Sequence, residues 1–258
     1  MKTSHKKRKI AVLIPCYNEE KGIAAVIDNL PRAKALERGF QIEVTVIDNN
    51  SDDRTAQIAR SFGAAVISEP QKGKGYAIRC GFCSVAEDID YVVMIDGDGT
   101  YRSDEILRLV ELLDSDFCDV VIGSRLGGRI LNGSMPAVNR VGNWIYSFLV
   151  RVFYNANVTD VLTGYFAWKR QALERLRPYL KCSGFDSEME MITKMARLGE
   201  EIYCVPISYN NRAGESNLRP FRDGIKIFWM FLKNLNWRPS KTIICDTVQT
   251  VSSIDTCK

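Results

Sequence analysis

Short apolar runs alternate with helical segments along the first half of the chain. Five such runs predict strands, at residues 10–14, 42–47, 64–68, 91–95 and 119–122. Between them lie segments that we assign to helices, at residues 19–36, 53–62, 74–86 and 103–113. Strands that alternate with helices predict an α/β fold, with a mostly parallel sheet covered by helices on both faces.

Beyond residue 123 this alternation gives way to a glycine-containing loop and longer helices. Gly127 and Gly128 belong to the predicted loop. The elements expected after it are helices at 138–154, 184–198 and 221–237 and a strand at 202–209. We therefore expect a basic tail (1–8), one folded domain (9–218), and an amphipathic helix with a polar tail (219–258).

Composition and charge exclude several classes of protein. The 258 residues carry 35 basic and 31 acidic side chains, a balance unlike that of a nucleic-acid binder. Of the eight cysteines, only Cys80 and Cys83 are closely spaced, and no second pair completes a zinc site. We see no secretory signal and no apolar run of the ~18 residues that span a bilayer. These features predict a cytoplasmic protein that is at most peripheral at the cytoplasmic face of a membrane.

Polar and acidic residues follow three of the predicted strands. The first strand runs into Pro15-Cys-Tyr-Asn-Glu-Glu20, the second into Asp48-Asn-Asn-Ser51, and the fourth into Asp96-Gly-Asp-Gly99. Lys72-Gly-Lys-Gly75 opens a helix. Helix capping or a turn explains any one of these segments. Because parallel strands end at one edge of a sheet, the segments together predict a common crevice.

Asp96 and Asp98 carry the clearest chemistry. Residues two apart in extended backbone point the same way, so both carboxylates can reach one cation. Oxygen ligands suit Mg²⁺ or Mn²⁺, which complete their shells with substrate phosphates and water. Gly97 leaves room for a diphosphate to approach the backbone. An isolated Asp-x-Asp is more often a solvated turn, but its place after a buried strand favours a metal site.

These segments resemble the GT-A fold of glycosyltransferase family 2, in its dolichol-phosphate-mannose-synthase-like branch. The likeness runs from about residue 9 to residue 218 and includes Ile122-Gly-Ser-Arg125 and Leu162-Thr-Gly-Tyr-Phe166. It implies a nucleotide-sugar donor, with Asp96 and Asp98 as ligands of the metal. The nucleotide-binding residues that it implies are Pro15, Tyr17, Asn18, Glu19, Asp48, Asn50, Lys74, Gly75, Asp96, Gly97 and Asp98.

Two later segments resemble the polyprenyl-phosphate sugar transferases of this family. They begin at Gly184-Phe-Asp-Ser-Glu and at Val205-Pro-Ile-Ser-Tyr. The resemblance implies a dolichyl-type phosphate as the acceptor and inversion at the anomeric carbon of the sugar. It assigns the acceptor phosphate to Asn139, Arg140, Arg212 and Ser216.

The chain departs from the family pattern at three places. Asn217 follows Ser216 where a lysine is usual, and Asp48-Asn-Asn-Ser51 replaces the common Asp-Asp-Gly-Ser. Thr100 stands where mannose synthases often carry Gln or Ser. These departures leave the sugar open, and with it the choice between a UDP-sugar and a GDP-sugar.

The residue types favour a phosphate acceptor. The one histidine, His5, lies in the basic tail, so a sugar hydroxyl would need a carboxylate as its general base. A phosphate monoester is already largely dianionic because its second pKa is about 6, and it requires cations instead. The carboxylate candidates are Asp186, Glu188 and Glu190, and the cationic candidates are Arg125, Arg140 and Arg212. Our catalytic candidates are Asp96, Asp98, Arg125, Glu188 and Glu190.

Two predicted helices carry aromatic and aliphatic side chains at helical spacing. Trp144 and Phe148 belong to the first, and Phe228 and Trp229 to the second. Such stripes are usually core, but aromatic helices flanked by lysine can also lie in a membrane interface. We expect peripheral membrane binding, with a separate membrane-spanning partner subunit as the other route to anchoring.

The leading hypothesis is metal-dependent transfer of a sugar to a polyprenyl phosphate, giving a lipid-phosphate sugar for glycan or glycoprotein assembly. One alternative is a family 2 enzyme that acts on a sugar hydroxyl. Another is a non-catalytic subunit that binds a nucleotide sugar or a lipid. A processive polysaccharide synthase is disfavoured because the chain has no Gln-x-x-Arg-Trp segment.

Overall fold

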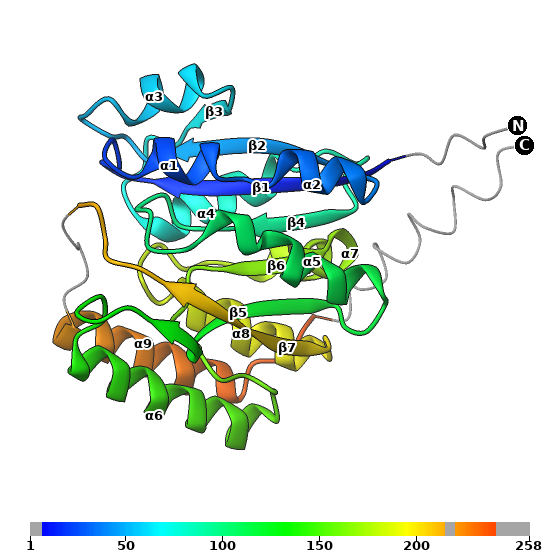
Figure 1. The fold of residues 1–258 in the computed structure, drawn as a ribbon. Coiled ribbons are helices and arrows are strands. Elements are labelled where there is room, and N and C mark those ends of the chain that lie inside the picture. The colour runs from blue at the N-terminus through cyan, green and yellow to red at the C-terminus, as the bar shows by residue number, and fades with distance from the viewer. Residues whose placement is uncertain (1–6, 215–219, 241–258) are drawn as a thin grey trace, which may run out of the picture.

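The computed structural model describes residues 7–214 and 220–240, which form a seven-stranded sheet in the order β3-β2-β1-β4-β6-β5-β7. The strands are β1 (Arg8–Cys16), β2 (Phe40–Asp48), β3 (Ala65–Ser68), β4 (Tyr91–Met94), β5 (Val120–Ile130), β6 (Phe166–Lys169) and β7 (Ile202–Tyr209). All neighbouring pairs are parallel except those of β6, which is antiparallel to β4 and to β5. The predicted mostly parallel α/β sheet is confirmed (Figure 1).

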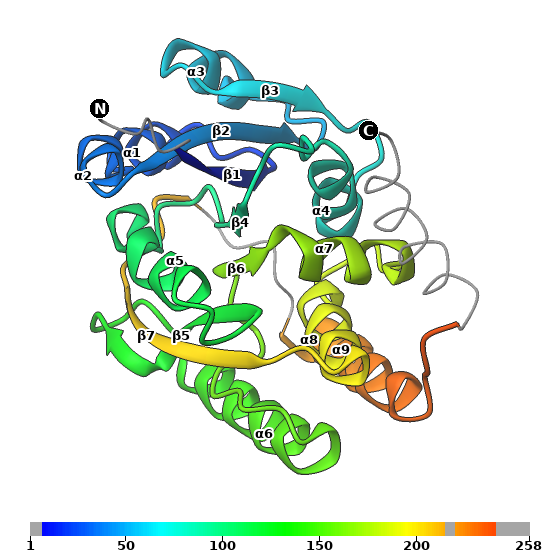
Figure 2. The ribbon, with the colours of Figure 1, turned by 90° about the vertical axis from the view of Figure 1, so that its right-hand side faces the viewer.

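Helices cover both faces of the sheet, as expected (Figure 2). One face packs against α1 (Ile23–Asp28), α2 (Arg32–Glu37), α3 (Thr55–Ser61) and α5 (Ile106–Asp114), with the 3₁₀ turn η1 (Ser103–Glu105) leading into α5. The other face packs against α4 (Lys74–Cys83), α6 (Ala137–Tyr154), α7 (Arg170–Leu176), α8 (Ser187–Leu198) and α9 (Pro220–Leu235). A second 3₁₀ turn, η2 (Arg177–Tyr179), follows α7.

The apolar strand runs reflect burial on both faces. In β1, Ile10, Val12 and Ile14 point into one core, whereas Ala11 and Leu13 point into the other. A strand covered on both sides gains by placing apolar side chains at every position, so it appears in the sequence as a continuous run. This is why the early strands could be predicted without any period-2 alternation.

Two predicted boundaries are wrong. The helix expected at 19–36 is two helices, because α1 ends at Asp28 and Pro31 precedes α2, and proline cannot continue a hydrogen-bonded helix. The expected loop at Gly127 and Gly128 is instead the far half of β5, which runs to Ile130 with an irregularity between Ser124 and Arg129. A side chain at Gly128 would collide with the backbone of Ile207 on β7.

The sequence did not predict β6 or α7. β6 is only four residues long, yet it is central and joins the two parallel parts of the sheet. Its Trp168 is fully buried and stacks on Phe166, with ring centroids 5.3 Å apart. Because β6 joins the two parallel parts, the strands on either side of it form one continuous sheet.

A buried polar network ties α6 to the sheet. Asp160 is fully buried and accepts hydrogen bonds from the Arg125 backbone N–H (2.7 Å), from the Arg125 guanidinium (2.8 Å) and from Asn143 on α6 (2.6 Å). Burial alone would raise the pKa of Asp160, but Arg125 and these hydrogen bonds hold it below its usual range. Arg125, which the sequence assigned to catalysis, is thus bound to Asp160 and does not line the cavity described below.

We predict that Asp160→Ala lowers the free energy of unfolding by about 3–5 kcal/mol, because it leaves the Arg125 charge buried without its partner. Urea-induced unfolding measures this loss. Glu174→Ala is the control, since it breaks the more exposed Arg170–Glu174 pair of α7 and should cost less than about 1 kcal/mol. Equal losses in the two variants would contradict a structural role for the buried network.

Candidate active site

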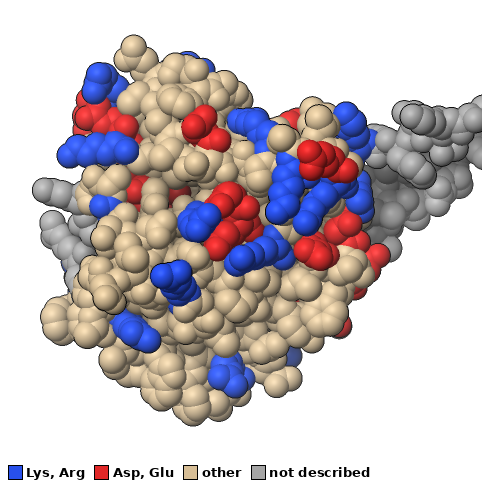
Figure 3. Space-filling model, in the orientation of Figure 1, with Lys and Arg blue, Asp and Glu red and all other residues tan. Residues whose placement is uncertain are grey.

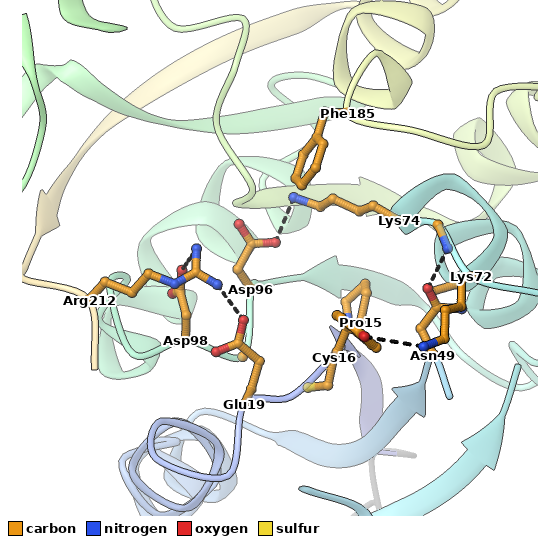
Figure 4. Close-up of a pocket in the computed structure, with 14 residues that line it drawn as sticks. Pro15, Cys16, Glu19, Asn49, Lys72, Lys74, Asp96, Asp98, Phe185 and Arg212 are labelled. Carbon is orange, nitrogen blue, oxygen red and sulfur yellow. Dashed lines mark hydrogen bonds and ion pairs between the residues drawn. The ribbon is translucent and has the colours of Figure 1, made fainter. Parts of the chain in front are cut away.

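A cavity of about 380 Å³ lies at the carboxyl ends of β1, β2 and β4, where the sequence placed the crevice. Eight of the predicted site residues line it: Pro15, Tyr17, Glu19, Lys74, Asp96, Gly97, Asp98 and Arg212. The other lining residues are Cys16, Asn49, Lys72, Gly73, Ala77 and Phe185. Figure 4 shows these side chains converging from separate segments of the chain.

Glycines allow the backbone to pack closely around the two aspartates. A side chain at Gly164 would collide with the carboxylate of Asp96, and one at Gly97 would collide with the Cys16 thiol. A side chain at Gly22 would collide with the backbone of Asp98. Two segments far apart in the sequence, at Gly22 and Gly164, therefore approach Asp96 and Asp98 closely because they lack side chains there.

Asp98 is buried and its orientation is fixed. Its Oδ1 accepts hydrogen bonds from the Thr100 backbone N–H (2.9 Å) and from the Thr100 hydroxyl (2.6 Å). Its Oδ2 lies 3.1 Å from the guanidinium of Arg212. Thr100, one of the departures from the family pattern, thus acts as a support for Asp98, a role that Ser could share through its hydroxyl.

Two basic side chains partly offset the charge of the acidic cluster. Lys74 Nζ lies 2.8 Å from Asp96 Oδ1 and 2.6 Å from Glu188 Oε1 (Figure 4 shows the Asp96 contact). Arg212 pairs with both Glu19 and Asp98. Lys74 begins α4, Glu188 lies in the first turn of α8, and Arg212 follows β7. Charged side chains from five segments of the fold therefore meet in one place.

Burial and these ion pairs shift the pKa values of several side chains. Burial raises the pKa of Glu19 to about 7, while Arg212 opposes that shift. Burial also raises the pKa of Glu188, against the effect of Lys74. Burial alone would lower the pKa of Lys74, but Asp96 and Glu188 outweigh it and raise the value. Lys74 therefore stays a cation and is paired with Asp96 and Glu188.

Hydrogen bonds of Asn49, which the sequence did not single out, hold the loop at the Lys72 and Gly73 end of the cavity. Its amide donates hydrogen bonds to the carbonyls of Glu69 (3.2 Å) and Gln71 (2.7 Å), and its carbonyl accepts one from Gly73 N–H (2.7 Å). An aspartate, common here in the family, could accept but not donate. The departure noted in the sequence thus allows Asn49 to fasten the loop that leads to Lys74.

Other predicted nucleotide residues surround the cavity without lining it. Asn18 and Asn50 have left-handed backbone (φ 56° and 60°), and Asn18 joins the two loops by accepting a hydrogen bond from Asp52 N–H. Asp48 Oδ1 is buried and has no hydrogen-bond partner. Gly75 packs so closely on the Cys182 backbone that no side chain would fit.

The remaining candidates lie elsewhere. Asn139 and Arg140 are at the start of α6 and do not line the cavity, and Ser216 lies outside the described residues. Glu190 is buried and pairs with Lys194 (2.6 Å), while its carboxylate accepts the N–H of Cys182 (2.8 Å). Of the acceptor-phosphate candidates in the described ranges, Arg212 alone lines the cavity.

The oxygen ligands in the cavity fit a hard divalent cation that takes its remaining ligands from a substrate. Asp96 and Asp98 offer carboxylate oxygens, and no group of three or more His, Cys, Asp or Glu suited to a metal exists within 7–214 and 220–240. Mg²⁺ and Mn²⁺ are commonly held by one or two carboxylates together with substrate phosphates and water. The two aspartates could therefore hold such an ion once a phosphate ligand is present.

The family model described as glycosyl transferase family 2 matches residues 11–177. The low-salt glycan biosynthesis hexosyltransferase Agl6 of Haloferax volcanii is 40% identical over 220 residues, which are 83% of this chain and 51% of Agl6. A dolichyl-phosphate hexose transferase of the same organism is 35% identical, over 84% of this chain and 90% of that protein. The chain thus spans about half the length of Agl6.

A solved structure shares the fold of this chain. Glucosyl-3-phosphoglycerate synthase from Mycobacterium tuberculosis, in complex with Mn²⁺, UDP and glucosyl-3-phosphoglycerate, superposes with a TM-score of 0.68. The match covers 91% of this chain and 82% of that structure at 24% identity, so it bears on the fold. The sequence match, the named relatives and the GT-A fold agree, and the chain belongs to glycosyl transferase family 2 and is a glycosyltransferase.

Proposed function

We propose that the protein transfers a sugar from a UDP- or GDP-sugar to a polyprenyl phosphate of the dolichyl type, with inversion, giving a lipid-phosphate sugar for glycan assembly. The observation that carries the donor half is the convergence of Asp96, Asp98, Lys74 and Arg212 in one cavity at the strand ends. Asp96 and Asp98 would hold Mg²⁺ or Mn²⁺, which would neutralise the departing nucleoside diphosphate. The structural neighbour with Mn²⁺ and UDP supports this arrangement.

The nucleoside would occupy the end of the cavity near Tyr17, Asn49 and Lys72. Tyr17 offers a ring face there, and Lys72 lies over it with its Nζ 5.0 Å from the ring centroid. Asp48 lies at the end of β2 beside this region, and its unpaired Oδ1 is an acceptor for an N–H of the base. Uracil and guanine both carry such a group, so this contact is compatible with either nucleotide.

The surroundings of the carboxylates support a phosphate acceptor over a sugar hydroxyl. Glu188 is bound to Lys74, and Glu190 is bound to Lys194 and to backbone N–H groups. A general base must contact the proton that it removes, and carboxylates already bound to lysine and to backbone N–H groups are not positioned to contact an acceptor hydroxyl. A phosphate acceptor needs no base, and the dolichyl-phosphate hexose transferase among the relatives supports that choice.

A groove on α9 offers a path for the lipid. It has a volume of about 580 Å³ and is lined by Asp186, Lys226, Trp229, Met230, Leu232 and Lys233. Asp186 directly follows Phe185, which lines the cavity of the proposed nucleotide site, so consecutive residues contribute to the groove and to the cavity. Apolar walls beside two lysines suit an isoprenoid chain with an anionic head group.

The helices α6 and α9 also present an apolar surface that fits a membrane. They pack together through hydrogen bonds from Tyr146 to Gly224 O (2.8 Å) and from Tyr154 to Phe231 O (2.6 Å). Their exposed apolar side chains are Val138, Val141, Trp144, Ile145, Phe148, Val152, Phe153, Phe221, Ile225, Phe228 and Trp229. Over α6 the surface is mostly uncharged, with scattered basic side chains (Figure 3). No helix in the described ranges has the length and apolarity to cross a bilayer.

Incubation with Mn²⁺, a labelled UDP- or GDP-sugar and a polyprenyl phosphate should carry label into the organic phase. Asp98→Asn should lower the rate by roughly 100-fold or more. The metal ion that would neutralise the leaving diphosphate would lose one of its two carboxylate ligands. Asp104→Asn, which removes an exposed carboxylate paired with Arg102, is the matched control and should keep the rate. Label that enters only soluble glycans, in a reaction abolished by Asp186→Asn, would favour the hydroxyl-acceptor alternative.

The membrane surface predicts binding to vesicles of phosphatidylcholine and phosphatidylserine. Trp144→Ser with Phe148→Ser should weaken sedimentation with vesicles at least about tenfold, because each aromatic side chain contributes ~1.5–3 kcal/mol on burial. Leu36→Ser on α2 is the control, since Leu36 is similarly exposed (51%, against 62% for Trp144) but lies on the opposite face of the sheet. Unchanged binding of the double variant, or no binding by the unaltered protein, would leave anchoring to a membrane-spanning partner.

A further inference from the structure

Each of the two proposed metal ligands has a basic side chain as its partner. Lys74 Nζ is 2.8 Å from Asp96 Oδ1, and Arg212 Nη1 is 3.1 Å from Asp98 Oδ2. Both cations line the cavity, and Figure 4 shows them reaching the aspartates from opposite sides. A divalent cation that bound these oxygens would therefore meet two positive charges already in place.

Each cation also has a second carboxylate on which it can remain. Lys74 contacts Glu188 at 2.6 Å, and Arg212 contacts Glu19. Both glutamates have little exposed side-chain surface, 6% and 11%. Lys74 and Arg212 could thus leave the aspartates by a small movement without losing all of their counter-charge. When all four carboxylates are ionised they exceed the two cations by two charges, which is the charge of one Mg²⁺ or Mn²⁺.

We propose that Lys74 and Arg212 occupy the metal ligands of the empty enzyme and release them when a nucleoside diphosphate binds, so that metal and nucleotide bind as a pair. The diphosphate gives both cations a new anionic partner, to which charge-assisted hydrogen bonds are strong. It also supplies the oxygen ligands that two aspartates alone cannot. This inference rests on the proposed metal and nucleotide site.

The arrangement has a thermodynamic consequence. If Lys74 and Arg212 leave Asp96 and Asp98 only for a diphosphate, nucleotide must strengthen Mn²⁺ binding, and Mn²⁺ must strengthen nucleotide binding by the same factor. The metal affinity of the free protein is then set by Lys74 and Arg212 as much as by the aspartates. Removing either cation should therefore improve metal binding in the absence of nucleotide.

Electron paramagnetic resonance of free Mn²⁺ tests this on the full-length protein, with and without UDP or GDP, after correction for the Mn²⁺–nucleotide complex. In the unaltered protein one nucleotide should lower the Kd for Mn²⁺ about tenfold or more, within the usual range of coupling between sites. Lys74→Met should lower the Kd of the nucleotide-free protein about tenfold and shrink the effect of nucleotide. Arg212→Met, on a different element, should act in the same direction.

Two controls separate the ion pair from the general loss of charge. Lys169→Met removes a lysine of similar exposure (19%, against 18% for Lys74) that pairs with Asp116 and Asp119 outside the cavity, and it should leave the nucleotide-free Kd within about twofold. Lys74→Met with Glu188→Gln preserves the net charge and avoids a buried unpaired glutamate, yet still frees Asp96. It should therefore bind Mn²⁺ as tightly as Lys74→Met alone. Thermal melts check that each variant folds.

The outcomes distinguish a failure of this inference from a failure of the proposed function. Mn²⁺ binding by the unaltered protein that is equally strong with and without nucleotide would overturn the inference and leave the metal site intact. An improvement in Lys74→Met that disappears in the double variant would also overturn it, because net charge would then be the cause. No Mn²⁺ binding even with UDP and GDP would refute the metal site itself, and with it the proposed function.

Discussion

Neutralisation of charge in one cavity is the constraint on which the rest of the site depends. The ends of β1 and β4 bring Glu19, Asp96 and Asp98 together, and so many carboxylates would repel one another without nearby cations. Lys74 and Arg212 supply those cations from α4 and from the segment after β7, which lie far apart in the sequence. The proposed site therefore depends on the segment after β7 as well as on the first half of the chain.

The same cavity is connected to the outer helices through buried polar contacts. Gly164 packs against Asp96, and two residues earlier the Leu162 backbone N–H donates to Asn143 on α6. Asn143 also binds Asp160, which holds Arg125. The inner face of α6 is thus fixed to the segment beside the proposed metal ligand, while its outer face carries the exposed aromatic side chains. Buried contacts therefore connect the proposed membrane surface to the proposed site.

The sequence pattern alone was sufficient to predict features that depend on residues close to one another in the sequence. The doubly covered strands were visible as apolar runs, and six candidate residues line the cavity because they lie at the ends of the parallel strands β1 and β4. β6 was missed because four residues carry no period, and Pro31 was passed over as a helix breaker. Arg125 illustrates the deeper limit: its partner Asp160 is 35 residues away, and only the fold reveals that they pair. Asn49 was overlooked because its three partners are main-chain groups of a loop.

The central claim is that Asp96 and Asp98 together hold a divalent metal against a nucleoside diphosphate. A crystal structure of the protein with Mn²⁺ and UDP or GDP, with data collected at the manganese absorption edge, tests it directly. The account predicts one anomalous peak between the two carboxylates and the diphosphate, with Lys74 and Arg212 turned from the aspartates towards phosphate oxygens. A nucleotide bound in this cavity with no metal at Asp96 and Asp98, or a metal bound elsewhere, would contradict it.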